Sequence, residues 1–173
     1  MDITVTGNTI KPFETNHDKD FYFYSIFQWI ERKNPKALLR AYWKAFEGRD
    51  DVTLLLKTYR VTYQTHEFDL IRQEILSLKR ELKQSHYPKI YLIKKLLTEQ
   101  EMWKLHATGD VYVSTSTGEG WNRPLVEAAL LGKPVISANS GGVTDMLSSM
   151  YYAVATKTVP ITPDPHAQWY EGD

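Results

Sequence analysis

The sequence predicts an α/β fold, in which a doubly wound parallel sheet carries helices on both faces. Two observations predict it. Short apolar runs alternate with segments of helical period along the chain, and most of these runs are apolar at successive positions. Strands that are buried on both faces give such continuous runs, and parallel strands need helical crossovers between them. In folds of this class, ligands bind at the carboxyl ends of the strands.

The first predicted unit is a strand at 21–27 ("FYFYSIF") followed by a helix with both ends marked. Asn34 is the expected N-cap, Pro35 takes the first helical position, and Gly48 is the expected C-cap. The apolar spacing predicts that this helix buries one face, made of Ala37, Leu38, Ala41, Tyr42 and Ala45.

The second unit is a strand at 52–58 ("VTLLLKT") and a helix over 67–84. Apolar residues recur in that helix at spacings of three and four, which predicts a buried face formed by Phe68, Ile71, Ile75, Leu78 and Leu82. A third strand is predicted at 89–93, and a capping box of Thr98 and Glu101 opens the next helix, which Gly109 closes.

The last predicted elements surround a glycine-rich loop. Strands at 111–115 and 134–138 flank this loop and a short helix from Pro124 to Leu131, which Gly132 ends. The run at 151–155 is a candidate sixth strand. We therefore expect one domain over 21–155, with 1–20 as a lead-in linker and 156–173 as an irregular, proline-rich tail.

Composition limits the function classes. The chain has 173 residues, of which 42% are apolar, so it can bury one core. The 21 basic and 21 acidic residues cancel, which argues against nucleic acid as a partner, and the absence of cysteine excludes disulfide, thiol and zinc-ribbon chemistry. No signal peptide and no apolar run of about 20 residues is present, so a cytoplasmic location is expected, with peripheral membrane association left open.

The stretch at 116–142, "STGEGWNRPLVEAALLGKPVISANSGG", holds the candidate site. Gly120, Trp121, Asn122 and Arg123 lead into the short helix, whose free N–H groups and dipole favour an anion such as a diphosphate. Carboxylates accept paired hydrogen bonds from vicinal hydroxyls. Glu127, inside the helix, is therefore placed for a ribose, and Glu119, before the turn, for a transferred sugar.

Cationic partners for the phosphates are expected from the ends of other strands, where Arg32, Lys33 and Lys57 lie. Lys33 is the strongest candidate, whereas Arg32 is expected to be a surface residue rather than to bind the ligand. Trp121 fits equally well beneath the loop or against a sugar, and the glutamates have a plain alternative as loop and helix-dipole carboxylates. The histidines lack metal-ligand spacing, and the sequence places His66, His86 and His106 on helix or loop surfaces.

These motifs resemble a known family. Glu119 and Glu127 are spaced as E-x7-E in "EGWNRPLVE", and "GKPVI" and Gly141-Gly142 follow. From Phe21 to Tyr152 the chain resembles the Rossmann-like, nucleotide-sugar-binding C-terminal domain of a retaining glycosyltransferase with the GT-B fold, closest to glycosyltransferase family 4. The resemblance implies that the second glutamate binds ribose, that the first lies near the sugar, and that no divalent metal or other cofactor is needed.

The resemblance also assigns catalytic and base-binding positions. It implies a phosphate-clamping lysine at Lys33 of "ERKNP" and gives catalytic roles to Lys33 and Glu119. The family's phosphate clamp also has an arginine further upstream. This sequence has "FQW" at that place instead, and Lys57 is the candidate substitute for the arginine. Backbone groups at Ile93, Lys94 and Leu97 are expected to seat the base.

The leading hypothesis is the donor-binding domain of an enzyme that transfers a hexosyl group from a nucleoside-diphosphate sugar to an acceptor. The N-terminal acceptor domain with its catalytic histidine is expected outside this chain, which alone would then not be catalytically competent. Two alternatives stay open: the nucleotide-binding half of a GT-B nucleotide-sugar epimerase, and a non-catalytic nucleotide-binding module.

Overall fold

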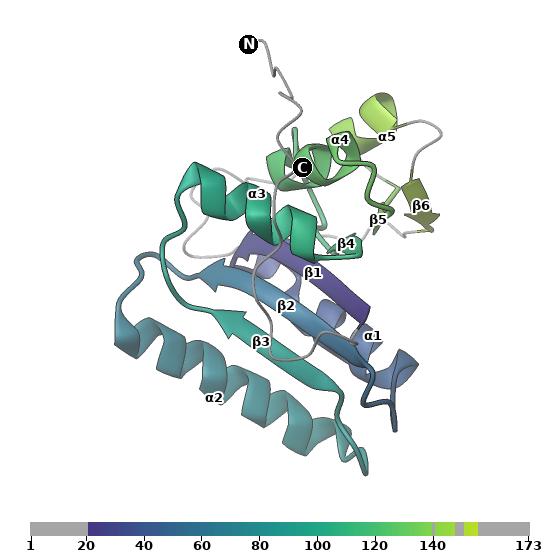
Figure 1. Ribbon diagram of the computed structural model, residues 1–173. Helices are drawn as coiled ribbons and strands as arrows, with labels where there is room; N and C mark the ends of the chain where they lie inside the picture. The colour runs from purple at the N-terminus through teal and green to yellow at the C-terminus, as the bar shows by residue number, and fades with distance from the viewer. Residues whose placement is uncertain (1–20, 140, 148–150, 156–173) are drawn as a thin grey trace, which may run out of the picture.

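The chain folds around a six-stranded sheet in which all paired strands run parallel (Figure 1). The structure, a computed structural model, describes residues 21–139, 141–147 and 151–155, without the side chains of 145–147 and 151. The spatial order is β3-β2-β1-β4-β5-β6. The strands are β1 (Phe21–Gln28), β2 (Val52–Tyr59), β3 (Lys89–Ile93), β4 (Val111–Ser114), β5 (Val135–Ala138) and β6 (Tyr151–Val154). This order confirms the predicted doubly wound fold, including the sixth strand.

Helices cover both faces of the sheet and enclose a separate core cluster on each. The helices α1 (Pro35–Ala45) and α2 (Thr65–Leu82) pack on one face, while α3 (Glu99–Thr108), α4 (Arg123–Leu130) and α5 (Gly142–Leu147) contribute to the cluster on the other. Leu54 and Leu56 of β2 face the first cluster, and Leu55 between them faces the second. Because β2 is buried on both faces, its sequence is apolar without alternation.

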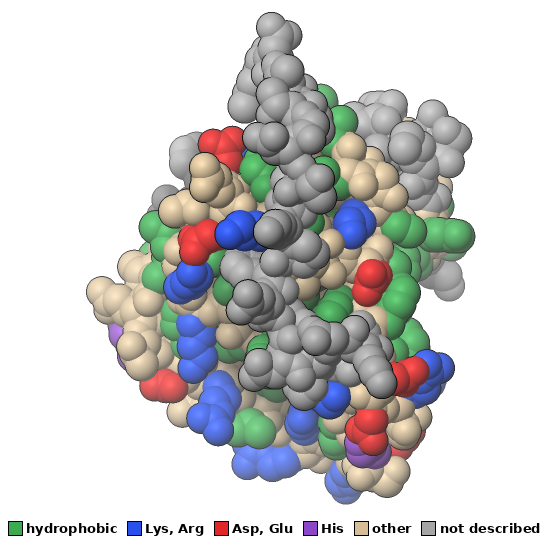
Figure 2. All heavy atoms as spheres, in the orientation of Figure 1, with side chains coloured by type: hydrophobic (Ala, Val, Ile, Leu, Met, Phe, Trp, Pro, Cys, Tyr) green, Lys and Arg blue, Asp and Glu red, His purple; other side chains and the backbone are tan. Residues whose placement is uncertain are grey.

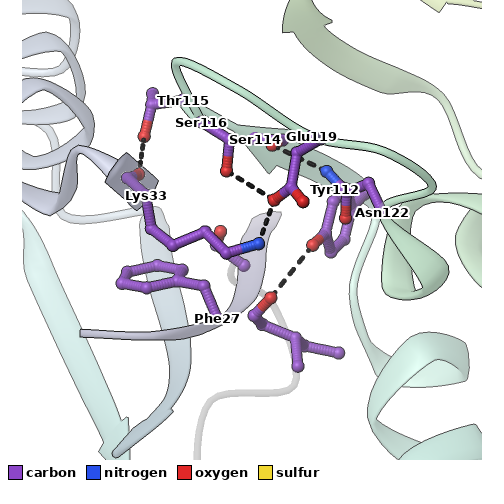
Figure 3. A pocket seen from close by; sticks show the side chains of 10 residues that line it. Phe27, Lys33, Tyr112, Ser114, Thr115, Ser116, Glu119 and Asn122 are labelled. Carbon is purple, nitrogen blue, oxygen red and sulfur yellow. Dashed lines mark hydrogen bonds and ion pairs between the residues drawn. The ribbon is translucent and has the colours of Figure 1, made fainter. Parts of the chain in front are cut away.

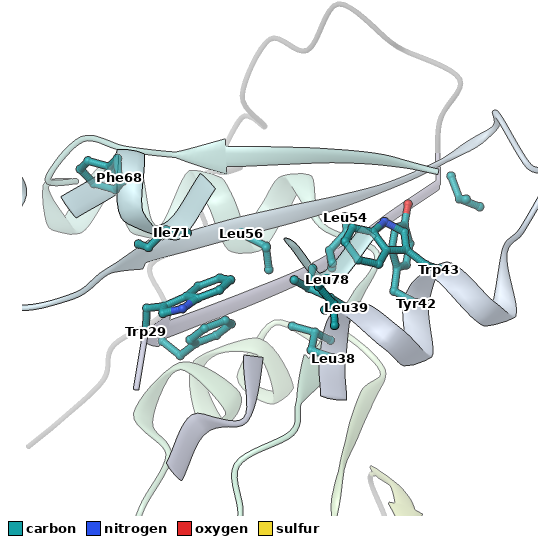
Figure 4. Close-up of a cluster of buried hydrophobic side chains, with 12 residues drawn as sticks. Trp29, Leu38, Leu39, Tyr42, Trp43, Leu54, Leu56, Phe68, Ile71 and Leu78 are labelled. Carbon is teal, nitrogen blue, oxygen red and sulfur yellow. The ribbon is translucent and has the colours of Figure 1, made fainter. Parts of the chain in front are cut away.

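The cluster beneath α1 and α2 is rich in aromatic side chains (Figure 4). Trp43 is fully buried there, and its ring meets Tyr87 edge-on with the centroids 5.1 Å apart. The predicted buried face of α1 is partly wrong. Leu38 and Tyr42 are buried as expected, but Ala41 and Ala45 are exposed, and the other buried apolar residues of the helix are Pro35, Leu39 and Trp43. The stripe containing Trp43 and Leu39 buries more apolar area than a stripe of alanines, so it faces the core.

Local capping signals predicted the starts of α1 and α3, whereas α2 runs over Thr65–Leu82 instead of the predicted 67–84. The Asn34 side chain accepts a hydrogen bond from the Ala37 N–H at 3.3 Å, and the capping box of Thr98 and Glu101 is complete. The prediction of Gly48 as the C-cap is wrong, because α1 ends at Ala45 with Phe46 as its cap. Gly48 lies in the following turn with φ of +79°. A short 3₁₀ helix, η1 (Glu31–Lys33), and α5 were not predicted.

The surface has mixed charge, as the equal counts of acidic and basic residues suggest. Figure 2 shows Lys and Arg side chains on the same face as Asp and Glu, with basic side chains more frequent toward α2 and β3. Among the described residues, no helix combines the length and the apolar character needed to cross a membrane. The predictions for 1–20 and 156–173 concern residues outside the described ranges.

Candidate functional site

A small polar pocket opens at the carboxyl ends of β1 and β4, where the strand order reverses (Figure 3). This is the position at which doubly wound folds bind their ligands. Figure 3 shows Lys33 and Glu119 reaching toward each other across it, from η1 and from the loop after β4. The lining residues are Ser25, Ile26, Phe27, Lys33, Tyr112, Ser114, Thr115, Ser116, Glu119 and Asn122.

Glu119 lies at the centre of a charged cluster. Lys33 Nζ donates to Glu119 Oε1, Ser116 Oγ donates to the same oxygen at 2.8 Å, and Arg32 Nη1 lies 3.3 Å from Glu119 Oε2. Burial alone would raise the pKa of Glu119, but the hydrogen bonds from Lys33 and Ser116 and the nearby positive charges hold the pKa below its usual value. Glu119 is therefore an ionised carboxylate held against two cations.

The expectation that Arg32 is mainly a surface residue is wrong. Its side chain is three-quarters buried, and Nη1 also donates to the Gly118 carbonyl. Backbone contacts fix the same two segments together, because the Thr117 N–H donates to the Arg32 carbonyl at 2.8 Å. The Thr115 hydroxyl lies 3.0 Å from the Lys33 carbonyl. The loop after β1 and the loop after β4 thus form one unit.

The start of α4 is held by a buried side-chain contact. Asn122 has a left-handed backbone with φ of 38°, and its Nδ2 donates to Ser114 Oγ at 2.9 Å. The helix begins at Arg123, one residue before the predicted start at Pro124. Within the described residues, the N–H groups of Asn122 and Arg123 make no hydrogen bond. They remain available to an anion at this helix N-terminus.

Glu127 lies in a second network, which sequence reasoning missed. Arg123 Nε donates to Glu127 Oε1 at 2.6 Å, and His106 Nε2 lies 3.2 Å from Glu127 Oε2. On its other side, His106 Nδ1 lies 3.0 Å from the Tyr24 hydroxyl. The expectation of a surface position for His106 is wrong, because its side chain is fully buried. The helical spacing of Met102, Leu105 and His106 was the signal that could have placed it on the buried face.

This network sets the charge state of Glu127. Burial alone would raise the pKa of Glu127, but the hydrogen bonds from His106 and Arg123 outweigh burial and hold the pKa below its usual value. Burial raises the pKa of the Tyr24 hydroxyl. Glu127 is thus a buried carboxylate with one buried partner, His106, and one exposed partner, Arg123.

Lys57 lies in the same part of the sheet. On β2 it pairs in register with Ile26 of β1, which lines the pocket, and with Ile93 of β3. Its Nζ lies 3.1 Å from the Tyr63 hydroxyl and 4.2 Å from the centre of that ring. Burial lowers the pKa of Lys57 to about 8.

The remaining predicted residues occupy varied environments. Gly120 and Trp121 are exposed, and the 63% exposure of Trp121 argues against the alternative in which it packs beneath the loop. Ile93 is half-buried at the end of β3, and Lys94 after it is exposed. Leu97 is buried in the core cluster of α3 and α4, so its side chain is a structural contact.

Two glycines bring a third loop close to Glu119. A Cβ at Gly141 would lie 2.4 Å from the Glu119 carbonyl oxygen, and a Cβ at Gly142 would lie 2.0 Å from that of Gly120. Gly141 also has a φ of +68°. Only glycine permits this approach of two backbones. In the part of the chain that is described, no group of three or more His, Asp or Glu side chains forms a metal-binding cluster.

Comparison with known proteins agrees with this fold. The sequence model of the family described as glycosyl transferases group 1 matches residues 8–159. No curated protein matches the chain in sequence. Among solved structures, the C-terminal domain of LpcC, a glycosyl transferase group 1 family protein from Francisella tularensis, is similar with a TM-score of 0.63 at 17% identity, over 86% of this chain and 78% of that domain.

Larger proteins share the fold over part of their length. HepE from Anabaena, solved with UDP and glucose, has a TM-score of 0.58 at 21% identity, over 80% of this chain and 35% of its own. A UDP-forming trehalose-phosphate synthase from Burkholderia xenovorans has a TM-score of 0.62 at 15% identity, over 78% of this chain and 33% of its own. The chain therefore spans about a third of the length of these two proteins.

Proposed function

The chain belongs to the glycosyl transferases group 1 family, and from this premise we propose that it binds the donor of a retaining enzyme that transfers a hexosyl group from a nucleoside-diphosphate sugar. The observation that carries the proposal is the cluster of Arg32, Lys33 and Glu119 beside the N-terminus of α4. Without a ligand, the two cations and the carboxylate satisfy one another. A nucleotide sugar offers each of them a better partner, with phosphate oxygens for the cations and hydroxyls for the carboxylate.

The same groups would stabilise the reaction's leaving group. When the bond between the anomeric carbon and the phosphate oxygen breaks, negative charge grows on the departing nucleoside diphosphate. The acceptor oxygen forms the new bond to that carbon, and the proton of the acceptor hydroxyl passes to the departing phosphate. Lys33, Arg32 and the free N–H groups at the start of α4 supply positive potential for the growing charge. In this proposal Lys33 stabilises the leaving group and Glu119 orients the sugar, without a divalent metal.

The nucleotide would extend from this cluster across the sheet. We assign the ribose to Glu127, the phosphates also to Lys57, and the base to the backbone at Ile93, Lys94 and Leu97. The register of Ile26, Lys57 and Ile93 across neighbouring strands supports this path. HepE, which shares the fold, was solved with UDP and glucose, so UDP is the first nucleotide to test. Because the chain spans about a third of such proteins, we assign acceptor binding to a further domain.

The proposal is tested by calorimetry with UDP, ADP, GDP and their hexose derivatives, each with and without a chelator of divalent cations. We expect one nucleoside diphosphate to bind, with affinity unchanged by the chelator. Lys33→Met should abolish most of this binding, whereas Lys36→Met, at an exposed position of α1, should not change it. If no nucleotide binds, or if the chelator removes binding, the proposal is wrong in its ligand or in its metal independence, respectively.

A further inference from the structure

His106 occupies an unusual place for an ionisable side chain. It is fully buried in the last turn of α3, among Tyr24 of β1, Tyr112 of β4 and Glu127 of α4. Buried polar groups need hydrogen-bond partners, and both ring nitrogens of His106 have one. The imidazole therefore links the core of the sheet to a carboxylate of the donor site.

The contacts define which nitrogen carries the proton. Glu127 is ionised and can only accept, so the Nε2 of His106, 3.2 Å from Oε2, must donate. Burial raises the pKa of Tyr24, so its hydroxyl keeps its proton, and its oxygen lies 3.0 Å from Nδ1. The tyrosine thus holds the ring at Nδ1, while Nε2 points a proton at Glu127.

These bonds leave part of the carboxylate free. A carboxylate has about four lone-pair sites, and within the described residues Glu127 uses one on each oxygen, for Arg123 and for His106. Two sites remain, which matches the two vicinal hydroxyls of a ribose. Arg123 is exposed and can move, whereas His106 has no space to turn. The orientation of the carboxylate therefore depends on the histidine.

We propose that His106 is a positioning residue for donor binding, which fixes the carboxylate of Glu127 so that its two remaining lone pairs are available to the ribose hydroxyls. This inference rests on the proposed function. In this proposal the Tyr24–His106 pair acts through Glu127 and does not itself touch the ligand.

The inference is tested with His106→Leu, which removes the donor, and His106→Gln, whose amide can still donate to Glu127. The same leucine substitution at the exposed His66 of α2 serves as the control. Affinity for UDP is measured by calorimetry from pH 5 to 8, and circular dichroism checks that each variant is folded. At pH 7, His106→Leu should weaken binding about tenfold or more, and His106→Gln should recover most of the loss.

The pH profile separates positioning from a general loss of packing. Without His106, burial of Glu127 loses its main opposing hydrogen bond, so the pKa of the carboxyl rises. The other titratable groups facing the pair are Tyr24, Tyr112 and Arg123, and tyrosine and arginine side chains do not normally change charge between about pH 4 and 8. As the pH is lowered, His106→Leu should therefore lose affinity at a higher pH than the wild type or His106→Gln does. The carboxyl ¹³C shift of Glu127, followed in the unliganded protein, should titrate at the same higher pH.

Two failures are distinguishable. If the wild type binds neither UDP nor another nucleoside diphosphate, the proposed function is contradicted, and the inference about donor binding falls with it. If the wild type binds and His106→Leu binds equally well, with the Glu127 titration unchanged, the inference alone is overturned.

Discussion

At the scale of single residues, the two glutamates of the site differ in what holds them. Glu119 is paired with two long cationic side chains, which can swing to a phosphate and release the carboxylate. Glu127 is held on one side by a buried imidazole that cannot move away. A ligand can therefore rearrange the partners of Glu119, while Glu127 offers a fixed contact.

This difference predicts that alanine substitutions of the two glutamates weaken the binding of different ligands. Glu127→Ala should weaken binding of the bare nucleoside diphosphate, because it removes the proposed ribose contact, at a cost of about 1.5–3 kcal/mol. Glu119→Ala should weaken only the sugar-bearing donor by a similar amount, since it leaves in place the cations of Lys33 and Arg32 proposed for the phosphates. Calorimetry with UDP and with UDP-hexose measures both effects. Equal losses of affinity for bare UDP in the two variants would contradict the assignment.

Lys57 should show a conflict between stability and binding. Burial lowers the pKa of its ammonium group to about 8, against about 10.4 in an unfolded chain, so the unfolded state binds more protons between these values. The unfavourable contribution of Lys57 to folding is thus fully present below pH 8 and disappears as the pH rises to about 10.4. We expect Lys57→Met to raise the melting temperature at pH 7 and to weaken binding of a nucleoside diphosphate, because a phosphate partner favours the charged lysine.

Thermal denaturation from pH 7 to 10, with calorimetry at pH 7, measures both effects. The gain in melting temperature should shrink toward pH 10, and Lys36→Met should show neither change. A melting temperature that falls in Lys57→Met would mean that its contacts with Tyr63 outweigh the cost of burial.

At the scale of elements, three loops must approach closely to build the site. The segment before α5 lies against the loop that carries Glu119, with no room for a side chain at Gly141 or Gly142. The loop after β4 is in turn bonded to η1. The position of Glu119 therefore depends on the start of α5, far along the chain.

Gly142→Ala should accordingly disrupt donor binding from outside the pocket. Its Cβ would lie 2.0 Å from the Gly120 carbonyl oxygen, so the loop with Glu119 must shift. Because small displacements of a positioned group can cost up to about 100-fold, we expect the affinity for a UDP-hexose to fall about tenfold or more. Gly48→Ala is the matched control: it has φ of +79° but open space around it, so it should cost about 1 kcal/mol of stability and leave binding unchanged. Equal affinities of the two variants would show that the close approach does not position Glu119.

The elements also show what a sequence can predict. Every described strand was predicted, because buried parallel strands have unmistakable apolar runs, and the starts at Asn34 and Thr98 were predicted because caps are local. The buried face of α1 and the burial of His106 were missed because tertiary partners decide them. Two apolar stripes adjoin on α1, and the one that carries Trp43 packs against Tyr87 in the core. Pairing of Arg32 with Glu119 similarly joins segments 87 residues apart, which no local pattern encodes.

At the scale of the whole molecule, the strand order places the candidate groups at one edge. The order reverses between β1 and β4, and both strands lead into the loops that carry Lys33 and Glu119. On the neighbouring strands, Lys57 and Ile93 lie in the same row of the sheet. In the proposed function, the nucleotide would extend along this edge of the sheet from its phosphates to its base.

The proposed function predicts that this chain binds the donor without transferring its sugar to an acceptor. In the proposed function the chain holds the donor, while the acceptor contacts come from a further domain of an enzyme about three times as long, as in HepE, of which the chain covers 35%. Transfer needs the acceptor oxygen held within about 3–3.5 Å of the anomeric carbon, which in this proposal is the task of the further domain. We therefore expect the 173-residue chain to bind a UDP-hexose, to hydrolyse it slowly at most, and to glycosylate no acceptor. Water needs no binding site of its own, so slow hydrolysis is compatible with half a cleft.

Mass spectrometry of incubations with donors and candidate acceptors checks this, with Lys33→Met as the control for any donor hydrolysis. Rapid formation of a glycosylated product by this chain would mean that it contains an acceptor site.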